Sequence, residues 1–354
     1  MFLLENMRYQ QSLSRMLARA ALDLIGRTII ITGATGMLGS CLVDALMLWN
    51  RRQDIPCRVI AVGRSTERAK ARFGAYWTEK TFSFCEQDVC MPAQNLPEKC
   101  DYIIHAASHA DPVHMAADPV HTLLANVAGT DHLLRYGLSH GMKRFLYVSS
   151  GEVYGQPDEK LSDFAEEYCG PVDLSNPRSC YPEGKRAAEV LCQSYISQYG
   201  VDAVIVRPCH LFGPTMTGTD SRAVSEFLRN AAAGRDIVLK SAGLLERSHC
   251  YVVDAVQAVL LVLTKGECGK TYNIADRRYQ MPVRDFARRA AEAGDCQVVF
   301  EMPSELEKEG YSRVRRAVLD TTRLEALGWL PGNQNAIETT TAILRECGLE
   351  KTHE

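Results

Sequence analysis

The sequence has no apolar run that approaches the roughly 18 residues of a membrane-spanning helix. Its 13 cysteines include no Cys-x-x-Cys pair, so the usual spacing of a structural zinc site is missing. A net charge of −3 leaves no excess of basic residues to attract nucleic acid or an anionic membrane. We therefore predict a cytoplasmic protein with reduced cysteines, no metal ion, and neither nucleic acid nor membrane as a partner.

What is present is an ordinary globular composition over 354 residues, enough for one large or two moderate domains. The first 25 residues carry three arginines among leucine, methionine and alanine, together with Glu5 and Asp23. The acidic residues and the lack of a continuous apolar segment argue against a targeting peptide. We expect an amphipathic helix within an N-terminal extension of residues 1–26.

A glycine-rich loop follows the first predicted strand. Residues 27–32 form a short β-branched run, typical of a strand buried on both faces, and lead directly into Gly33, Gly36 and Gly39. Glycines at this spacing allow a tight turn and let the backbone approach a pyrophosphate, which the N-terminus of the following helix stabilises. The loop predicts dinucleotide binding. The residues expected to hold the cofactor here are Gly33, Thr35, Gly36, Met37, Leu38 and Gly39.

Strands and helices then alternate along the chain. Further strands are predicted at 58–62, 81–89, 102–107, 144–150 and 203–207, with helices between them. This alternation predicts an α/β protein with a Rossmann-type, doubly wound parallel sheet, whose ligands bind at the carboxyl ends of the strands. Residues near three of these ends are also expected to contact the cofactor: Arg64, Asp88, Val89, Ala106 and Ala107.

The identity of the cofactor depends on Arg64. Arg64 follows Gly63 at the end of the second strand, where dinucleotide folds often carry an acidic residue for the ribose hydroxyls. A guanidinium could pair with the 2′-phosphate of NADP or stack on the adenine of NAD. We expect NAD and keep NADP as the alternative. The reason is that an enzyme which takes a hydride from its substrate and later returns it needs no exchange of cofactor.

The regular alternation ends after Arg207, where prolines interrupt the chain and the remaining elements are irregularly spaced. We predict a smaller lobe interleaved with the last elements of the sheet. The expected division is a dinucleotide-binding domain of residues 27–207 with about 245–275, and a substrate-binding lobe of residues 208–244 and 276–354.

A tyrosine and a lysine four residues apart provide the candidate chemistry. Tyr181 and Lys185 would share one face of a helix, and Ser150 ends the fifth predicted strand. A phenol has a pKa of about 10, and a lysine ammonium and a cationic nicotinamide nearby would lower it. Tyr181 would then act as a general base on a sugar hydroxyl while hydride leaves the same carbon.

These motifs, in this order, resemble the extended short-chain dehydrogenase/reductase family, which modifies nucleotide sugars. Within it, the sequence is most similar to the UDP-glucuronate decarboxylases, or UDP-xylose synthases. The resemblance runs from about Thr28 to Pro331. Besides the glycine loop and Asp88-Val89, it is carried by the segments His105–Ser108, Asp118–Asn126, Ser150–Gly155, Tyr181–Arg186, Arg207–Pro214 and Arg247–Asp254.

The resemblance implies roles for the matching residues. Ser150 would donate a hydrogen bond to the reacting oxygen, Tyr181 would be the base and Lys185 its electrostatic partner. Glu152 would lie near C5 and C6 of the sugar, and Arg247 would bind the substrate carboxylate or diphosphate. The other residues implied to contact the cofactor or the sugar are Ser108, Asn126, Gly151, Pro208 and His210.

Three positions depart from the family pattern. Ser150 stands where these enzymes usually have threonine, and Gly151 stands where decarboxylases have serine and 4,6-dehydratases aspartate. Glycine cannot supply the proton that a leaving C6 hydroxyl needs, which argues against dehydration. His210 replaces an asparagine that touches the substrate phosphates; either a cationic imidazole takes that role or the histidine only packs. The nucleotide therefore stays open, with a UDP-sugar expected.

The leading hypothesis is decarboxylation of UDP-glucuronate: oxidation at C4, loss of carbon dioxide from the resulting β-keto acid, and re-reduction at C4. A nucleotide-sugar 4-epimerase would share the first step and is one alternative. A sensor that binds a dinucleotide without catalysis is another. The family also implies a homodimer, formed by the helices near 118–140 and 182–199.

Overall fold

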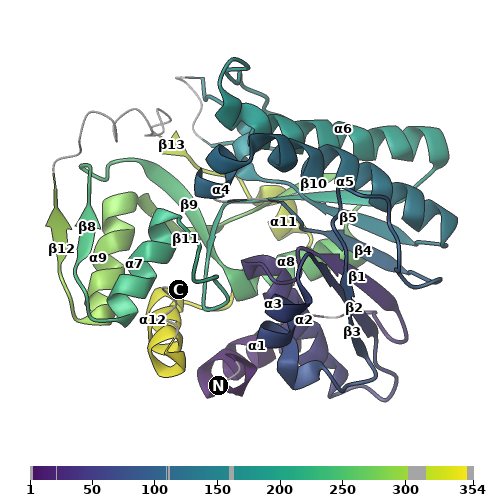
Figure 1. Ribbon diagram of the computed structural model, residues 1–354. Coiled ribbons are helices and arrows are strands. Elements are labelled where there is room, and N and C mark those ends of the chain that lie inside the picture. Colours follow the sequence, from purple (N-terminus) through teal and green to yellow (C-terminus); the bar gives the residue numbers. More distant parts are fainter. Residues whose placement is uncertain are drawn as a thin grey trace.

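The computed structural model describes residues 3–20, 22–108, 110, 112–158, 163–301 and 316–348 (Figure 1). Part of the predicted sugar-binding lobe, residues 302–315, lies outside this description.

A seven-stranded parallel sheet forms the centre of the protein, with strand order β10-β6-β5-β4-β1-β2-β3. The chain crosses over after β3, so β1 and β4 are neighbours and a ligand crevice is expected at their carboxyl ends. The strands are β1 (Thr28–Thr32), β2 (Arg58–Gly63), β3 (Phe82–Glu86), β4 (Tyr102–His105), β5 (Arg144–Val148), β6 (Ala203–Pro208) and β10 (Thr271–Ile274).

Helices cover both faces of this sheet, as the continuous apolar runs of the strands require. Every residue of β1 is buried; Ile30 packs in one core, whereas Ile29 and Ile31 pack in the other. Figure 1 shows α5 and α6 on one face and α2, α3 and α8 on the opposite face. These helices are α2 (Met37–Asn50), α3 (Thr66–Phe73), α5 (Pro119–Ser139), α6 (Cys180–Tyr199) and α8 (Val252–Lys265). The predicted Rossmann-type sheet is confirmed.

The predicted smaller lobe lies beside the carboxyl ends of β5 and β6 and contains two small sheets and a group of helices (Figure 1). In one sheet β9 pairs with β7, β11 and β13; in the other β8 pairs with β12. The strands are β7 (His210–Phe212), β8 (Ile237–Leu239), β9 (Glu246–Tyr251), β11 (Asp276–Pro282), β12 (Val298–Phe300) and β13 (Arg316–Ala317). The helices are α7 (Ala223–Ala232), α9 (Val283–Gly294), α11 (Thr322–Ala326) and α12 (Ala336–Cys347).

The N-terminal segment packs against both parts of the protein. It contains η1 (Leu3–Glu5) and the predicted amphipathic helix, α1 (Met7–Arg19), which Asn6 caps. The Tyr9 hydroxyl donates to Asp44 of α2 at 2.9 Å, and Arg8 pairs with Glu346 of α12 at 2.7 Å. The two ends of the described part of the chain are therefore in contact, through α1 and α12.

Several details differ from the sequence prediction. The fourth strand ends at His105 rather than at residue 107, and the fifth ends at Val148 rather than at Ser150. The third strand ends at Glu86 rather than Val89, because Asp88 accepts a hydrogen bond from the backbone of Cys90 at 2.9 Å and turns the chain. In addition, β9 belongs to the small sheet, although it leads directly into α8 on the face of the large one. The proposed domain boundaries remain a prediction.

Candidate active site

The glycine loop connects β1 to α2 at the carboxyl edge of the sheet. Gly33 has a φ of +64°, and a Cβ there would lie 2.6 Å from the carbonyl oxygen of Ala106. A side chain at Gly39 would clash with the backbone of Gly33. The N-terminus of α2 has no side-chain cap at Gly36, so its first N–H groups are directed at the space that a pyrophosphate would fill. The cradle fits a dinucleotide.

The chain after β4 forms the next wall of this crevice. Ala106, Ala107 and Ser108 follow the strand, and the backbone N–H of Ala107 donates to Thr32 at 3.3 Å. Asn126 of α5 donates to Ser108 at 3.1 Å and accepts from the Tyr147 hydroxyl at 3.1 Å. Because Asn126 is completely buried, it supports Ser108 from behind, and direct contact with a sugar, as implied by the family, is not favoured.

Tyr181 and Lys185 lie on the first turns of α6, next to the carboxyl end of β5. Their exposed fractions are only 6% and 2%. The Lys185 ammonium donates to the carbonyl of Val148 at 2.7 Å and lies 5.7 Å from the centre of the Tyr181 ring. The structure thus brings together the three residues that the sequence predicts: Ser150 and Tyr181 are hydrogen-bonded, with Lys185 behind them.

The electrostatics of this pair correct one expectation. Burial raises the pKa of Tyr181 to about 12, with Glu152 as the next cause, while the hydrogen bond with Ser150 and the charge of Arg178 act in the opposite direction. Burial also lowers the pKa of Lys185 to about 7. The lysine is therefore a weak source of positive charge. The protein's own groups do not lower the pKa of the phenol as predicted, and a cationic nicotinamide remains the group that could.

Glu152 lies in η3 (Gly151–Tyr154), the turn of 3-10 helix after β5, which the Ser150 side chain caps. Arg178, in η4 (Pro177–Ser179), donates to both oxygens of Glu152, at 2.9 and 2.8 Å. This partner was missed from the sequence, although Arg178 precedes Tyr181 by three residues. Gly151 itself lies beside Leu319 and the carbonyl of Pro208, so only a small side chain fits there without displacement.

Arg247 and His210 lie on β9 and β7, which pair in the small sheet that also contains β11 and β13. Arg247 of β9 is buried. Burial lowers its pKa, and the negative charge of Glu152 acts in the opposite direction. His210 of β7 pairs in register with His249 of β9, and their rings lie 5.8 Å apart. Although His210 reaches solvent, partial removal from water lowers its pKa, and His249 and Arg247 add to the shift. A cationic His210, one of the two predictions, is therefore not favoured.

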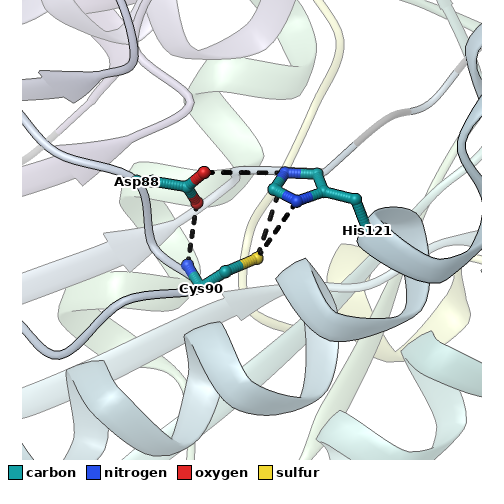
Figure 2. A group of neighbouring side chains, drawn as sticks. All are labelled: Asp88, Cys90 and His121. Atoms are coloured by element: carbon teal, nitrogen blue, oxygen red, sulfur yellow. Dashed lines mark hydrogen bonds and ion pairs between the residues drawn. The ribbon is translucent and has the colours of Figure 1, made fainter.

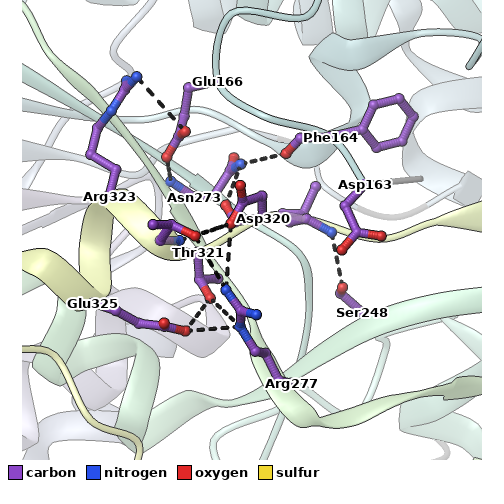
Figure 3. A network of polar contacts seen from close by, with 12 residues as sticks. Asp163, Phe164, Glu166, Ser248, Asn273, Arg277, Asp320, Thr321, Arg323 and Glu325 are labelled. Atoms are coloured by element: carbon purple, nitrogen blue, oxygen red, sulfur yellow. Dashed lines mark hydrogen bonds and ion pairs between the residues drawn. The ribbon is translucent and has the colours of Figure 1, made fainter. Parts of the chain in front are cut away.

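A polar network surrounds Asn273 of β10 (Figure 3). It reaches the turn that carries Glu152 through Tyr154, the last residue of η3. The side chain of Asn273 on β10 donates to the carbonyls of Phe164 and Asp320, each at 2.9 Å, and accepts from the hydroxyl of Tyr154. The backbone N–H of Leu319 donates to the hydroxyl of Ser248 on β9 at 3.1 Å. The network joins the end of η3 to the segment before α11 and to the small sheet, and so fixes the sugar side of the site.

At the opposite end, Asp88, Cys90 and His121 meet in a small cluster (Figure 2). The Cys90 sulfur lies 3.6 Å from Nδ1 of His121, and Arg64 is 3.1 Å from Nε2 of the same ring. The sequence predicts no such grouping, since Arg64, the Asp88–Cys90 pair and His121 come from three separate segments. A guanidinium beside the ring disfavours a second cation, so we interpret the cluster as part of the adenosine end of the crevice. Val89 is buried beside it.

A cavity of about 220 Å³ lies elsewhere, between α1, the start of α8 and Gly332-Asn333. It is lined by none of the predicted site residues.

None of the 13 cysteines is paired with another in the structure. Among the helices that the structure describes, none combines the length and the apolar composition of a membrane span.

Residues 29–275 match the model of the NAD dependent epimerase/dehydratase family. The chain belongs to this family. Membership confirms the predicted resemblance and NAD as the cofactor expected from the sequence.

Several curated proteins of this kind are similar in sequence. UDP-glucuronic acid decarboxylase 1 of Xenopus tropicalis is 34% identical over 67% of this chain and 53% of its own length. UDP-glucuronic acid decarboxylase 2 of Arabidopsis thaliana is 32% identical over 86% of this chain and 65% of its own length. The chain thus spans between about half and two thirds of these two relatives.

Solved structures share the fold. The dTDP-glucose 4,6-dehydratase of Streptomyces venezuelae, solved with NAD, is 24% identical, with a TM-score of 0.75 over 90% of this chain and 97% of its own. UDP-glucuronic acid 4-epimerase of Bacillus cereus, solved with UDP-glucuronic acid and NAD, is 18% identical, with a TM-score of 0.74 over 90% and 99%. At these identities the likeness establishes the fold class.

Proposed function

We propose that the protein is an NAD-dependent UDP-glucuronate decarboxylase. The observation that carries this proposal is the grouping of Ser150, Tyr181 and Lys185 at the carboxyl edge of the sheet, with Glu152 and two arginines on the sugar side. The names of the similar sequences support the same substrate. Gly151 supports decarboxylation over dehydration, because it offers no acid for a leaving C6 hydroxyl.

The glycine loop, the N-terminus of α2 and the walls formed by Ala106, Ala107 and Pro208 would hold the cofactor. NAD, when bound, supplies a hydride acceptor at C4 of the sugar and later the donor. Tyr181 takes the proton of the C4 hydroxyl, and Ser150 donates a hydrogen bond to the same oxygen. Lys185, anchored on Val148, holds the tyrosine side of the site in place. Glu152 and Arg247 orient the sugar and its diphosphate.

Oxidation at C4 makes the C6 carboxylate part of a β-keto acid, which loses carbon dioxide because the remaining electron pair is shared with the C4 carbonyl. The chain's task is therefore to position C4 against Tyr181 and to exclude water. The deeply buried Tyr181–Lys185 pair is suited to both.

Incubation of the purified protein with UDP-glucuronate and NAD tests the proposal. We expect carbon dioxide and a UDP-pentose, measured by trapped label and by mass spectrometry. A 4-epimer of the uronate with no carbon dioxide would indicate the epimerase instead. Binding of NAD without any turnover on a panel of nucleotide sugars would indicate a sensor.

We also propose a homodimer formed through α5 and α6. Large apolar side chains of both helices are exposed, which is unusual for a surface that faces water alone. They include Val120, Leu124, Leu138, Val190 and Tyr199. The free thiols support a reducing, cytoplasmic setting. Light scattering of the purified protein, with Val190→Asp as the disrupting variant, measures the expected assembly.

A further inference from the structure

Arg178 links the expected base to the acidic residue of the sugar side. It lies in η4, which leads directly into α6, and its Nη2 donates to both oxygens of Glu152 at 2.9 and 2.8 Å. Its guanidinium carbon lies 5.9 Å from the centre of the Tyr181 ring. One arginine thus contacts two groups between which the reacting part of a sugar would be placed.

This ion pair is accessible to a ligand. The side chains of Arg178 and Glu152 are 38% and 42% exposed. Arg247 is only 7% exposed, and its Nη1 donates to the backbone carbonyl of Glu246. Arg222, which also acts on Tyr181, is held by Asp220 at 2.6 Å. Of these three arginines, Arg178 therefore has the most exposed side chain.

We propose that Arg178 is the receptor for the C6 carboxylate of the sugar, and that Glu152 occupies this receptor until the substrate binds. The inference rests on the decarboxylase function proposed above. One carboxylate replaces another on the same guanidinium, so the exchange conserves the charge-assisted hydrogen bonds. It also leaves Glu152 beside the sugar and separated from its partner.

Decarboxylation reverses the exchange. The C5–C6 bond breaks, carbon dioxide leaves as a neutral molecule, and its electron pair remains on C5 and the C4 oxygen as an enolate, which later takes a proton at C5. The ligand has then lost the group that competes for Arg178. Glu152 pairs with Arg178 again, and the product binds more weakly than the substrate.

Binding measurements in a Tyr181→Phe background, in which turnover is expected to be at least about 100-fold slower, test this exchange. Calorimetry compares UDP-glucuronate with UDP-xylose, which lacks the carboxylate, in the presence of NAD. We expect UDP-glucuronate to bind about tenfold more tightly, because its carboxylate keeps the hydrogen bonds of Arg178 while the released Glu152 gains hydrogen bonds to water, and a hydrogen bond to a charged group contributes about that much. Arg178→Met should remove this preference and leave UDP-xylose binding unchanged, whereas Arg178→Lys should keep part of it.

Glu152→Gln provides the decisive contrast. If Glu152 competes for Arg178, removing its charge should strengthen UDP-glucuronate binding. If the Arg178–Glu152 pair had only a structural role, Arg178→Met and Glu152→Gln would both weaken the binding of UDP-glucuronate. That result overturns the inference. Persistence of the preference in Arg178→Met also overturns it. Arg135→Gln is the matched control, because Arg135 forms a similar ion pair with Asp131, at 2.8 Å, on the surface of α5.

The proposed function has a separate readout. Absence of carbon dioxide from the unmutated protein contradicts the decarboxylase, whatever the binding series shows. Release of carbon dioxide without a carboxylate preference that depends on Arg178 contradicts only the exchange.

Discussion

The cofactor side and the sugar side of the candidate site differ in how the chain builds them. On the cofactor side, Gly33, Gly36 and Gly39 lie within one loop, and Tyr181 and Lys185 within two turns of one helix. On the sugar side, Glu152, Arg178 and Arg247 come from separate segments; an ion pair joins Glu152 to Arg178, and Arg247 interacts with the charge of Glu152.

The two sides also differ in burial and charge. Tyr181 and Lys185 are almost completely buried, whereas Glu152 and Arg178 are partly exposed. A buried, uncharged environment suits a hydride transfer that is common to many sugars. An open cluster of charges suits the recognition of one anionic sugar. The difference suggests that substitutions on the first side affect every substrate, and that those around Arg178 distinguish between substrates.

The largest effect is expected for Tyr181→Phe. Loss of a general base should lower kcat by about 10²- to 10⁴-fold, because the C4 hydroxyl then has no proton acceptor. NAD binding should be unchanged, as the aromatic ring remains. Single-turnover kinetics with UDP-glucuronate and calorimetry with NAD measure both quantities. Full turnover by the variant would contradict the assignment of the base.

Gly33→Ala should weaken NAD binding by roughly 100-fold, and each tenfold loss of affinity corresponds to about 1.4 kcal/mol. The added methyl group meets the carbonyl of Ala106, so the loop must shift. Gly141→Ala is the matched control. Gly141 has a similar φ of +70°, but no atom lies within 4 Å of its added Cβ. Equal losses of NAD affinity in the two variants would show that the close approach at Gly33 is unimportant.

Arg247→Gln should weaken UDP-glucuronate and UDP-xylose alike, by about tenfold, if Arg247 binds the diphosphate that both share. Arg178→Met, in contrast, should affect UDP-glucuronate alone. If Arg247→Gln weakened the binding of UDP-glucuronate alone, Arg247 rather than Arg178 would be the residue that binds the carboxylate. Calorimetry in the Tyr181→Phe background measures all four affinities.

Lys185→Met should change how stability depends on pH. The pKa of Lys185 is lowered to about 7 in the folded protein, so between pH 7 and the unfolded value of about 10.4 the unfolded chain holds a proton that the native state lacks. This raises the free energy of unfolding with pH, by about 1.4 kcal/mol per pH unit within that window. The variant should lose this rise. Urea unfolding at several pH values compares the two proteins.

His210→Asn should have the smallest effect, with KM for the nucleotide sugar changing by less than about threefold, as for one neutral hydrogen bond exchanged for another. Removal from water and the neighbouring His249 and Arg247 lower the pKa of His210, so we expect its imidazole to be neutral from pH 5 to 8. The ratio of the KM values of variant and unmutated protein should therefore be constant over this range. A ratio that rises toward acid pH would show that a cationic His210 binds the phosphates.

The local patterns of the sequence determined the cofactor side. A β-branched run followed by spaced glycines can hardly form anything but a buried strand and a tight loop, and Tyr181 and Lys185 share a helix face through helical periodicity alone. These relations depend on neighbours in the chain, so the sequence predicted the sheet, the glycine loop and the Tyr181–Lys185 pair.

The tertiary structure alone decided the sugar side. The ion pair of Arg178 with Glu152, the register of His210 with His249 and the burial of Asn126 depend on segments that are far apart in the sequence and meet only in the folded protein. The tertiary structure also determined the pKa values of Tyr181 and Lys185. The sequence suggested that Lys185 would lower the pKa of Tyr181, whereas burial lowers the pKa of the lysine and raises that of the phenol. Desolvation is a property of the whole packed structure, and no spacing of residues in a sequence expresses it.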